Sequence, residues 1–212
     1  CIRGSQELAD IVTDIAALPL PLPSLRHLGA VHGGFLAAAV ALVRTVKPLL
    51  LALKRQHPAY AVRVVGHSLG AGVAVPFTLL VRAELPCARA VVFGVPACVT
   101  ESLVPGTLEC VTSFVNRNDP LPSVSPHVIG PIINTIIDTL IGFVPGLLSS
   151  IRFVPPGKLF CLCGDDDDAS AASSSPVYTR LKPVNYSFFK DLVVRSRPIS
   201  SHVCDGYEAS FS

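Results

Sequence analysis

The most restrictive feature of the sequence is a glycine-rich turn between an apolar run and a helical pattern. It reads Gly-His-Ser-Leu-Gly-Ala-Gly over residues 66–72 and follows the apolar run at 61–65. Glycines two places before and after a serine let two backbones pack closely while the serine adopts a strained conformation. The pattern predicts a tight strand-to-helix turn that exposes the hydroxyl of Ser68 at a helix N-terminus. A phosphate-binding loop is the weaker alternative, because the Walker lysine is absent.

Strand and helix patterns alternate along the rest of the chain. We predict strands at 61–65, 88–93, 110–115, 158–163 and 177–181, and helices at 7–17, 34–55, 69–84 and 132–144. This alternation predicts an α/β fold with a mostly parallel central sheet and helices on both faces. The 212 residues suffice for one domain, so we expect residues 1–212 to form a single domain, cut from a longer protein.

Composition excludes one class of partner and favours another. The net charge of +2 comes from 17 basic and 15 acidic residues with no basic block, so nucleic acid is not expected as a partner. The longest apolar stretches, 35–53 and 128–148, are interrupted by charged residues or prolines and do not resemble clean membrane spans. The amphipathic helix predicted at 132–144 leads us to expect that residues 129–148 touch lipid beside the site.

Several segments carry no expected metal or catalytic role. The alternating Leu-Pro segment at 18–23 predicts a stiff extended linker, and the acidic, serine-rich segment at 164–176 predicts an insertion between two strands. The aspartates from Asp165 to Asp168 match no EF-hand loop, so calcium is not expected there. The seven irregularly spaced cysteines favour free, mostly buried thiols over disulfides or a metal site.

A serine becomes a strong nucleophile when a histidine takes its proton and a carboxylate orients that histidine. After a turn of this type the chain order is serine, acid, histidine. Asp119 follows the strand predicted at 110–115, at the sheet edge where Ser68 is expected. Asp138 on a helix and the aspartates of the insertion fit this position less well.

Two histidines follow the acid. We prefer His202 as the base, because His127 lies only eight residues after Asp119; the other four histidines precede Ser68. The reaction also needs two N–H donors for the oxyanion. Leu69 supplies one, and the second must come from a loop after an earlier strand, for which residues 2–5 are the visible candidate.

Together these segments resemble the class 3 lipase family, the fungal-lipase-like group that includes sn-1-specific diacylglycerol lipases. The resemblance rests on Ile2-Arg3-Gly4-Ser5, Val31-His32-Gly33-Gly34-Phe35, the elbow with Gly66, His67 and Gly70 around Ser68, Asn116-Arg117-Asn118-Asp119-Pro120-Leu121-Pro122, and Ser201-His202 with Tyr207-Glu208. It implies an α/β-hydrolase fold whose N-terminal strands are missing from this chain.

The resemblance also implies a function. The family cleaves acylglycerol esters without a cofactor; here Ser68, Asp119 and His202 would form the triad and Ser5 and Leu69 the oxyanion hole. Residues 7–17 would form or lead into the lid. Residues 154–158 and 191–194 are most similar to diacylglycerol lipases, in which the acidic insertion coincides with a regulatory loop. Ser201 departs from the aspartate that this branch often has before the base histidine.

The sequence therefore predicts a serine lipase that hydrolyses di- or triacylglycerol through an acyl-enzyme. A phospholipase A1 or galactolipase and a non-catalytic lipid-binding domain of the same fold are the alternatives. We expect a lipid substrate and association with a membrane or lipid-droplet surface, through this domain's apolar surface or through other parts of the parent protein. No metal is expected, and the sequence indicates no particular compartment.

Overall fold

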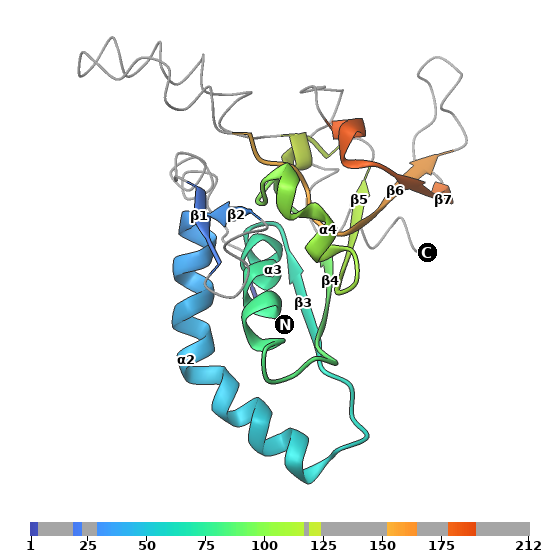
Figure 1. The fold of residues 1–212 in the computed structure, drawn as a ribbon. Coiled ribbons are helices and arrows are strands. Elements are labelled where there is room, and N and C mark those ends of the chain that lie inside the picture. Colours follow the sequence, from blue (N-terminus) through green and yellow to red (C-terminus); the bar gives the residue numbers. More distant parts are fainter. Residues whose placement is uncertain (4–18, 23–28, 117–118, 124–151, 165–177, 190–212) are drawn as a thin grey trace, which may run out of the picture.

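The computed structural model describes residues 1–3, 19–22, 29–116, 119–123, 152–164 and 178–189, which surround a five-stranded sheet of order β3-β4-β5-β6-β7 (Figure 1). The first four strands are mutually parallel, and β7 is antiparallel to β6. The mostly parallel sheet of the predicted fold class is confirmed, and each predicted strand overlaps an observed one. The strands are β3 Arg63–His67, β4 Arg89–Phe93, β5 Val111–Asn116, β6 Lys158–Gly164 and β7 Tyr178–Val184.

Two longer helices lie beside the sheet. Helix α3 (Leu69–Val81) contacts β3 and β4, and α2 (Gly33–Gln56) packs along α3 (Figure 1). Helix α3 ends at Val81, three residues before the predicted end, and the chain turns over residues 82–84. The predicted helices at 7–17 and 132–144 lie outside the described residues. The short elements are α4 Val104–Thr107, η1 Glu101–Leu103, η2 Leu121–Ser123 and η3 Tyr186–Phe189.

The core lies between α3 and one face of the sheet. Val64, Ala90 and Val92 point to this face, are buried, and join the side chains of α3 in one hydrophobic cluster. On the opposite face a row of half-buried aromatic rings crosses the sheet in register. Phe93 stacks on Phe114 at 5.4 Å between ring centroids, and Phe114 stacks on Phe160 at 5.7 Å. The sheet is thus apolar on both faces, as a mostly parallel sheet requires.

The Leu-Pro segment differs from its prediction. Its extended geometry is observed, but residues Pro19–Pro21 form strand β1, which pairs antiparallel with β2 (Ala30–His32). Proline cannot donate a ladder hydrogen bond but still accepts one, so it is tolerated in edge strands. A two-stranded sheet consists only of edges, and the segment is therefore a strand instead of a linker.

The N-terminal residues lie beside β3. Ile2 forms a parallel bridge with Gly66, and its N–H donates to the carbonyl oxygen of Val65 at 2.7 Å. The segment predicted to precede the oxyanion donor therefore starts next to the strand that leads to Ser68.

Candidate active site

Ser68 is the single residue between the end of β3 and the start of α3. With φ 57° and ψ −128°, it is the only non-glycine residue with positive φ in the described part of the chain. Such a conformation costs on the order of 1–3 kcal/mol and persists where the surroundings enforce it. Here the Ser68 N–H donates to the Phe93 carbonyl at 3.0 Å, and the Ser68 carbonyl accepts from Ala71 and Gly72 at 2.9 and 3.1 Å. The predicted strained turn is present.

Two glycines make this turn possible. A Cβ added to Gly66 would lie 2.4 Å from the carbonyl oxygen of Gly70, so the strand contacts the helix through bare backbone. A Cβ added to Gly72 would lie 2.7 Å from the ring of Phe35, so α2 also approaches the turn closely. Gly66 therefore has the packing role that the sequence pattern predicts, whereas Gly72 makes room for Phe35 of α2, a contact that the pattern did not predict.

His32, the histidine of the Val-His-Gly-Gly-Phe element, packs against Phe35. His32 is 2% exposed, and its ring centroid lies 4.4 Å from that of Phe35 and 5.4 Å from that of Phe153. Neither ring nitrogen has a hydrogen-bond partner among the described residues, and burial lowers the pKa of His32 to about 4. His32 is therefore neutral at physiological pH and packs as an aromatic ring. The sequence pattern identified the Val-His-Gly-Gly-Phe element but did not predict the contact between Phe35 and Gly72. The small residue at position 72 was the only sequence feature that could have indicated it.

Asp119 lies just beyond the carboxyl end of β5, as predicted. It is 4% exposed, its N–H donates to the Asn116 carbonyl at 2.9 Å, and its Oδ1 accepts from the N–H of Leu121 at 2.9 Å. This turn fixes the direction of the carboxylate. Because β3 and β5 are parallel strands of one sheet, Ser68 and Asp119 follow strand ends at the same edge.

Helix α3 begins at Leu69, the residue that the sequence predicted as one oxyanion donor. Leu69 is its first residue, and no backbone carbonyl of the described residues accepts from the Leu69 N–H. The first N–H groups of a helix lack intrahelical acceptors and carry a partial positive charge. An oxyanion beside Ser68 would therefore meet a favourable field.

The other predicted site residues, His202 and Ser5, lie outside the described residues, as do His127, Asp138 and the aspartates from Asp165 to Asp168. Within the described ranges, no three His, Cys, Asp or Glu side chains gather as metal ligands would. What the structure brings together is a strained serine, a helix N-terminus and a buried carboxylate at one edge of the sheet.

Comparison with curated proteins finds lipases. A segment of 120 residues, 48% of this chain and 29% of the relative, is 32% identical to secreted mono- and diacylglycerol lipase 2 of Gibberella zeae. A segment covering 58% of this chain and 19% of the relative is 30% identical over 129 residues to mouse diacylglycerol lipase-beta. The chain thus spans less than a third of the length of these curated relatives.

Solved structures agree with the fold. MDLA from Penicillium cyclopium, solved in a mutant form, has a TM-score of 0.61 at 19% identity, covering 98% of this chain and 66% of its own. The Rhizomucor miehei lipase in its propeptide complex has a TM-score of 0.59 at 19% identity, covering 78% and 48%. The sheet and helices described above are therefore those of an α/β-hydrolase fold.

A family comparison covers the elbow and the acid together. The family model described as lipase (class 3) matches residues 1–129, a range that includes Ser68 and Asp119. This range exceeds half of the chain, and the chain therefore belongs to the class 3 lipase family.

Proposed function

We propose that this protein is a serine lipase that hydrolyses acyl esters of di- or triacylglycerol. The observation that carries the proposal is the strained backbone of Ser68 at the N-terminus of α3, in a chain of the class 3 lipase family. Strain of this kind is maintained where a side chain must be presented in one direction. Two curated relatives are named as diacylglycerol lipases, which supports the substrate class.

The proposed reaction proceeds through an acyl-enzyme. His202 takes the Ser68 proton as Oγ bonds to the ester carbon, and Asp119 orients the imidazole. The tetrahedral intermediate collapses, the C–O bond to glycerol breaks, and His202 returns the proton to the leaving alkoxide. A water molecule then loses a proton to His202 and attacks the acyl-enzyme, which releases the fatty acid and restores Ser68.

Two backbone donors would stabilise the oxyanion. Leu69 follows the nucleophile directly, and its N–H has no backbone acceptor among the described residues. Ile2 forms a parallel bridge with Gly66, two residues before Ser68, so the N-terminal segment lies beside the strand that leads to the nucleophile. This placement supports Ser5 as the second donor, since both donors must face one oxygen atom.

We further propose that the enzyme acts at a membrane or lipid-droplet surface, where its apolar substrate is found. A phospholipase A1 or galactolipase would use the same residues and differ in the head group it accepts. Hydrolysis rates on diacylglycerol, triacylglycerol, phosphatidylcholine and galactolipid separate these activities, and we expect diacylglycerol to be hydrolysed fastest.

Covalent labelling tests the nucleophile. In the complete protein, a fluorophosphonate probe should label the wild type and the Ser102→Ala control, whose serine is exposed on η1. It should not label Ser68→Ala, which should also lose diacylglycerol hydrolysis by a factor of about 10⁴ or more. Retained labelling and hydrolysis in Ser68→Ala would disprove the mechanism, and an unlabelled wild type would favour the non-catalytic lipid-binding alternative.

A further inference from the structure

A cleft lies where α4 meets the start of β6 and the end of β7 (Figure 1). Its volume is about 610 Å³, within the range of sites that bind small molecules. The N–H of Gly157 donates to Thr107 Oγ1 at 2.8 Å, which holds α4 against the residue that precedes β6. Ser68, Leu69 and Asp119 do not line the cleft, so it is separate from the candidate active site.

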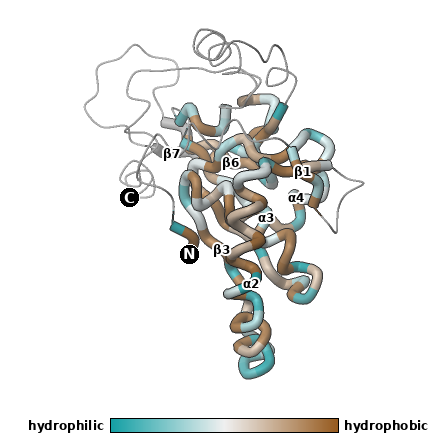
Figure 2. The backbone as a smooth tube through the Cα atoms, turned by 90° about the vertical axis from the view of Figure 1, so that its left-hand side faces the viewer, coloured by the Kyte–Doolittle hydropathy of each residue, from teal (hydrophilic) through white to brown (hydrophobic). Residues whose placement is uncertain are grey.

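The walls of the cleft are mostly apolar. Figure 2 shows hydrophobic residues on both α4 and β6, which line it. Leu108 is 41% exposed, whereas Leu159 is 4% exposed and packs with Val115 and Phe189 in a buried cluster. Walls of this kind take up the hydrocarbon part of a ligand. The apolar residues that line the cleft are Val104, Pro105, Leu108, Leu159, Pro183 and Val184.

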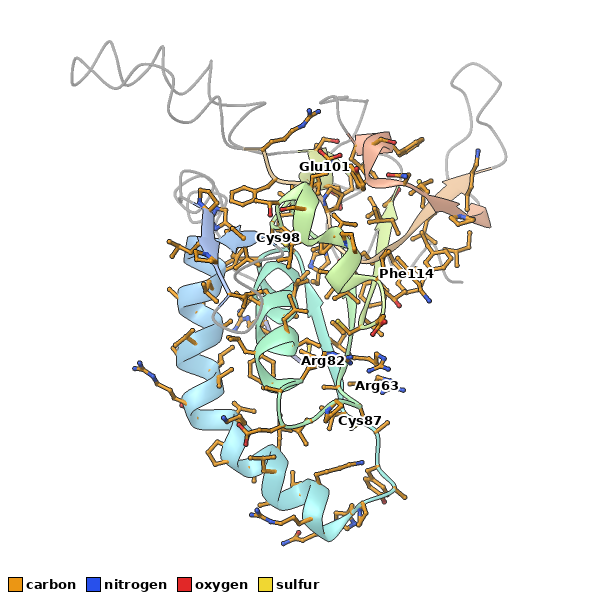
Figure 3. All side chains as sticks on the ribbon, in the orientation of Figure 1. Arg63, Arg82, Cys87, Cys98, Glu101 and Phe114 are labelled. Atoms are coloured by element: carbon orange, nitrogen blue, oxygen red, sulfur yellow. The ribbon has the colours of Figure 1, made fainter. Side chains whose placement is uncertain are left out.

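The one negative charge of the cleft is already engaged. The Tyr186 hydroxyl donates to the carboxylate of Glu101 and so links η3 to η1. This hydrogen bond raises the pKa of Tyr186, whereas the charge of Arg152 lowers it, so Arg152 lies close enough to offset the charge of Glu101. Figure 3 shows Arg63 and Arg82 well away from Glu101, and neither arginine lines the cleft.

Lys158 leaves a positive charge at the cleft. It lines the cleft at the start of β6, is exposed, and forms no ion pair or side-chain hydrogen bond within the described residues. A lysine keeps its ammonium group in water while its stem lies along apolar surface. Apolar walls beside one unopposed ammonium group suit a ligand with a hydrocarbon chain and a single negative head group.

We infer that this cleft binds a long-chain fatty acid, with its chain against Leu108, Leu159 and Val184 and its carboxylate paired with Lys158. A fatty acid is also what the proposed reaction releases, and in this respect the inference rests on the proposed function. Each methylene group removed from the chain should weaken binding by up to about fourfold, because its transfer out of water is lost.

Photolabelling of the complete protein tests the inference. A long-chain fatty acid that carries a diazirine group is photoactivated on the protein below its micelle concentration, and the labelled peptides are identified by mass spectrometry. We expect label within residues 101–108, 157–160 and 183–186, in the wild type and in Ser68→Ala alike. The fatty alcohol of the same length should label these segments less, by up to about fivefold, because it lacks the charge that pairs with Lys158.

Matched variants locate the ligand within the cleft. Leu108→Asp should lower labelling of the three segments about tenfold, because a carboxylate replaces an apolar wall. Lys158→Gln should lower labelling by the acid to the level of the alcohol. The controls are Leu181→Asp and Lys182→Gln, whose side chains are exposed on β7 but do not line the cleft, and both should be labelled like the wild type.

Absence of label from the three segments, undiminished label in Leu108→Asp, or an equal loss in Leu181→Asp would overturn the inference. If Leu108→Asp does not fold, equal labelling of the wild-type cleft by acid and alcohol overturns it instead. A wild-type dimer that Leu108→Asp makes monomeric, with labelling unchanged, would show that the cleft binds a second copy. Hydrolysis without labelling of the cleft refutes this inference alone, and labelling of the cleft without hydrolysis by the wild type refutes the lipase mechanism alone.

Discussion

Gly66→Ala should inactivate the protein by displacing the nucleophile. The added methyl would lie 2.4 Å from the Gly70 carbonyl oxygen and 2.6 Å from its carbonyl carbon, both backbone atoms at the start of α3. Ordinary contact begins at about 3.4 Å, so the strand and helix must separate by about 1 Å. A misplacement of this size costs about 100-fold in rate, because the attacking oxygen leaves its aligned position. Overpacking of this kind also lowers the free energy of unfolding by about 1–3 kcal/mol.

Gly72→Ala provides the contrast. The atoms nearest to its added methyl belong to the ring of Phe35, at 2.7 Å, and a smaller side chain at position 35 would remove them. We expect Gly72→Ala to lose stability and part of its activity, and Phe35→Leu in the same chain to restore much of both. Phe35→Leu should not restore Gly66→Ala, whose clash is with backbone.

The measurements are kcat/KM on a soluble short-chain ester and the midpoint of urea unfolding for all variants. The short-chain ester removes membrane binding from the comparison. Gly66→Ala with wild-type kcat/KM would refute the reasoning, because the elbow would then tolerate the separation without moving Ser68. Equal rescue of both glycine variants by Phe35→Leu would show that the two clashes are not distinct.

Three further outcomes follow from single buried groups. Burial lowers the pKa of His32 to about 4 from an ordinary 6.5, so between these pH values the unfolded state binds more protons than the folded state. The free energy of unfolding should therefore fall by up to about 3 kcal/mol as the pH drops from 6.5 to 4. In urea unfolding, His32→Phe should lack this pH dependence. Burial raises the pKa of the fully buried Cys98 thiol, so a thiol reagent should leave Cys98 unmodified in the folded protein while the exposed Cys1 reacts. Asp119→Asn keeps an oxygen for the Leu121 N–H but loses the charge, so kcat should drop by about 10⁴ with little change in the unfolding midpoint.

Local features of the sequence were sufficient to predict the strands and the elbow. An apolar run followed by glycines at fixed distances from Ser68 specifies the turn within about ten residues, so no distant partner is needed. The position of Asp119 was also predictable, because it lies three residues after the end of β5. The bridge of Ile2 to Gly66 and the contact of Phe35 with Gly72 join segments 64 and 37 residues apart, and no local pattern encodes them.

For the Leu-Pro segment, the sequence predicted the backbone conformation but not the pairing partner. Its prolines correctly predicted extended backbone, since proline fixes φ, but pairing depends on β2, about ten residues downstream. The burial of His32 likewise depends on Phe153, which lies more than a hundred residues away. Composition can show that a histidine stands in a motif, but only the assembled fold shows that it is packed between aromatic rings.

Helix α2 is packed against the elbow at one end and projects from the fold at the other (Figure 1). Phe35 at the first turn of α2 supports the elbow through Gly72, while Leu49 and Leu53 on the projecting turns are exposed. Phe35 and Leu49 are fourteen residues or about 21 Å apart along the helix, beyond the distance at which substitutions usually couple. Substitutions on the projecting turns should therefore leave the packing of the elbow unchanged.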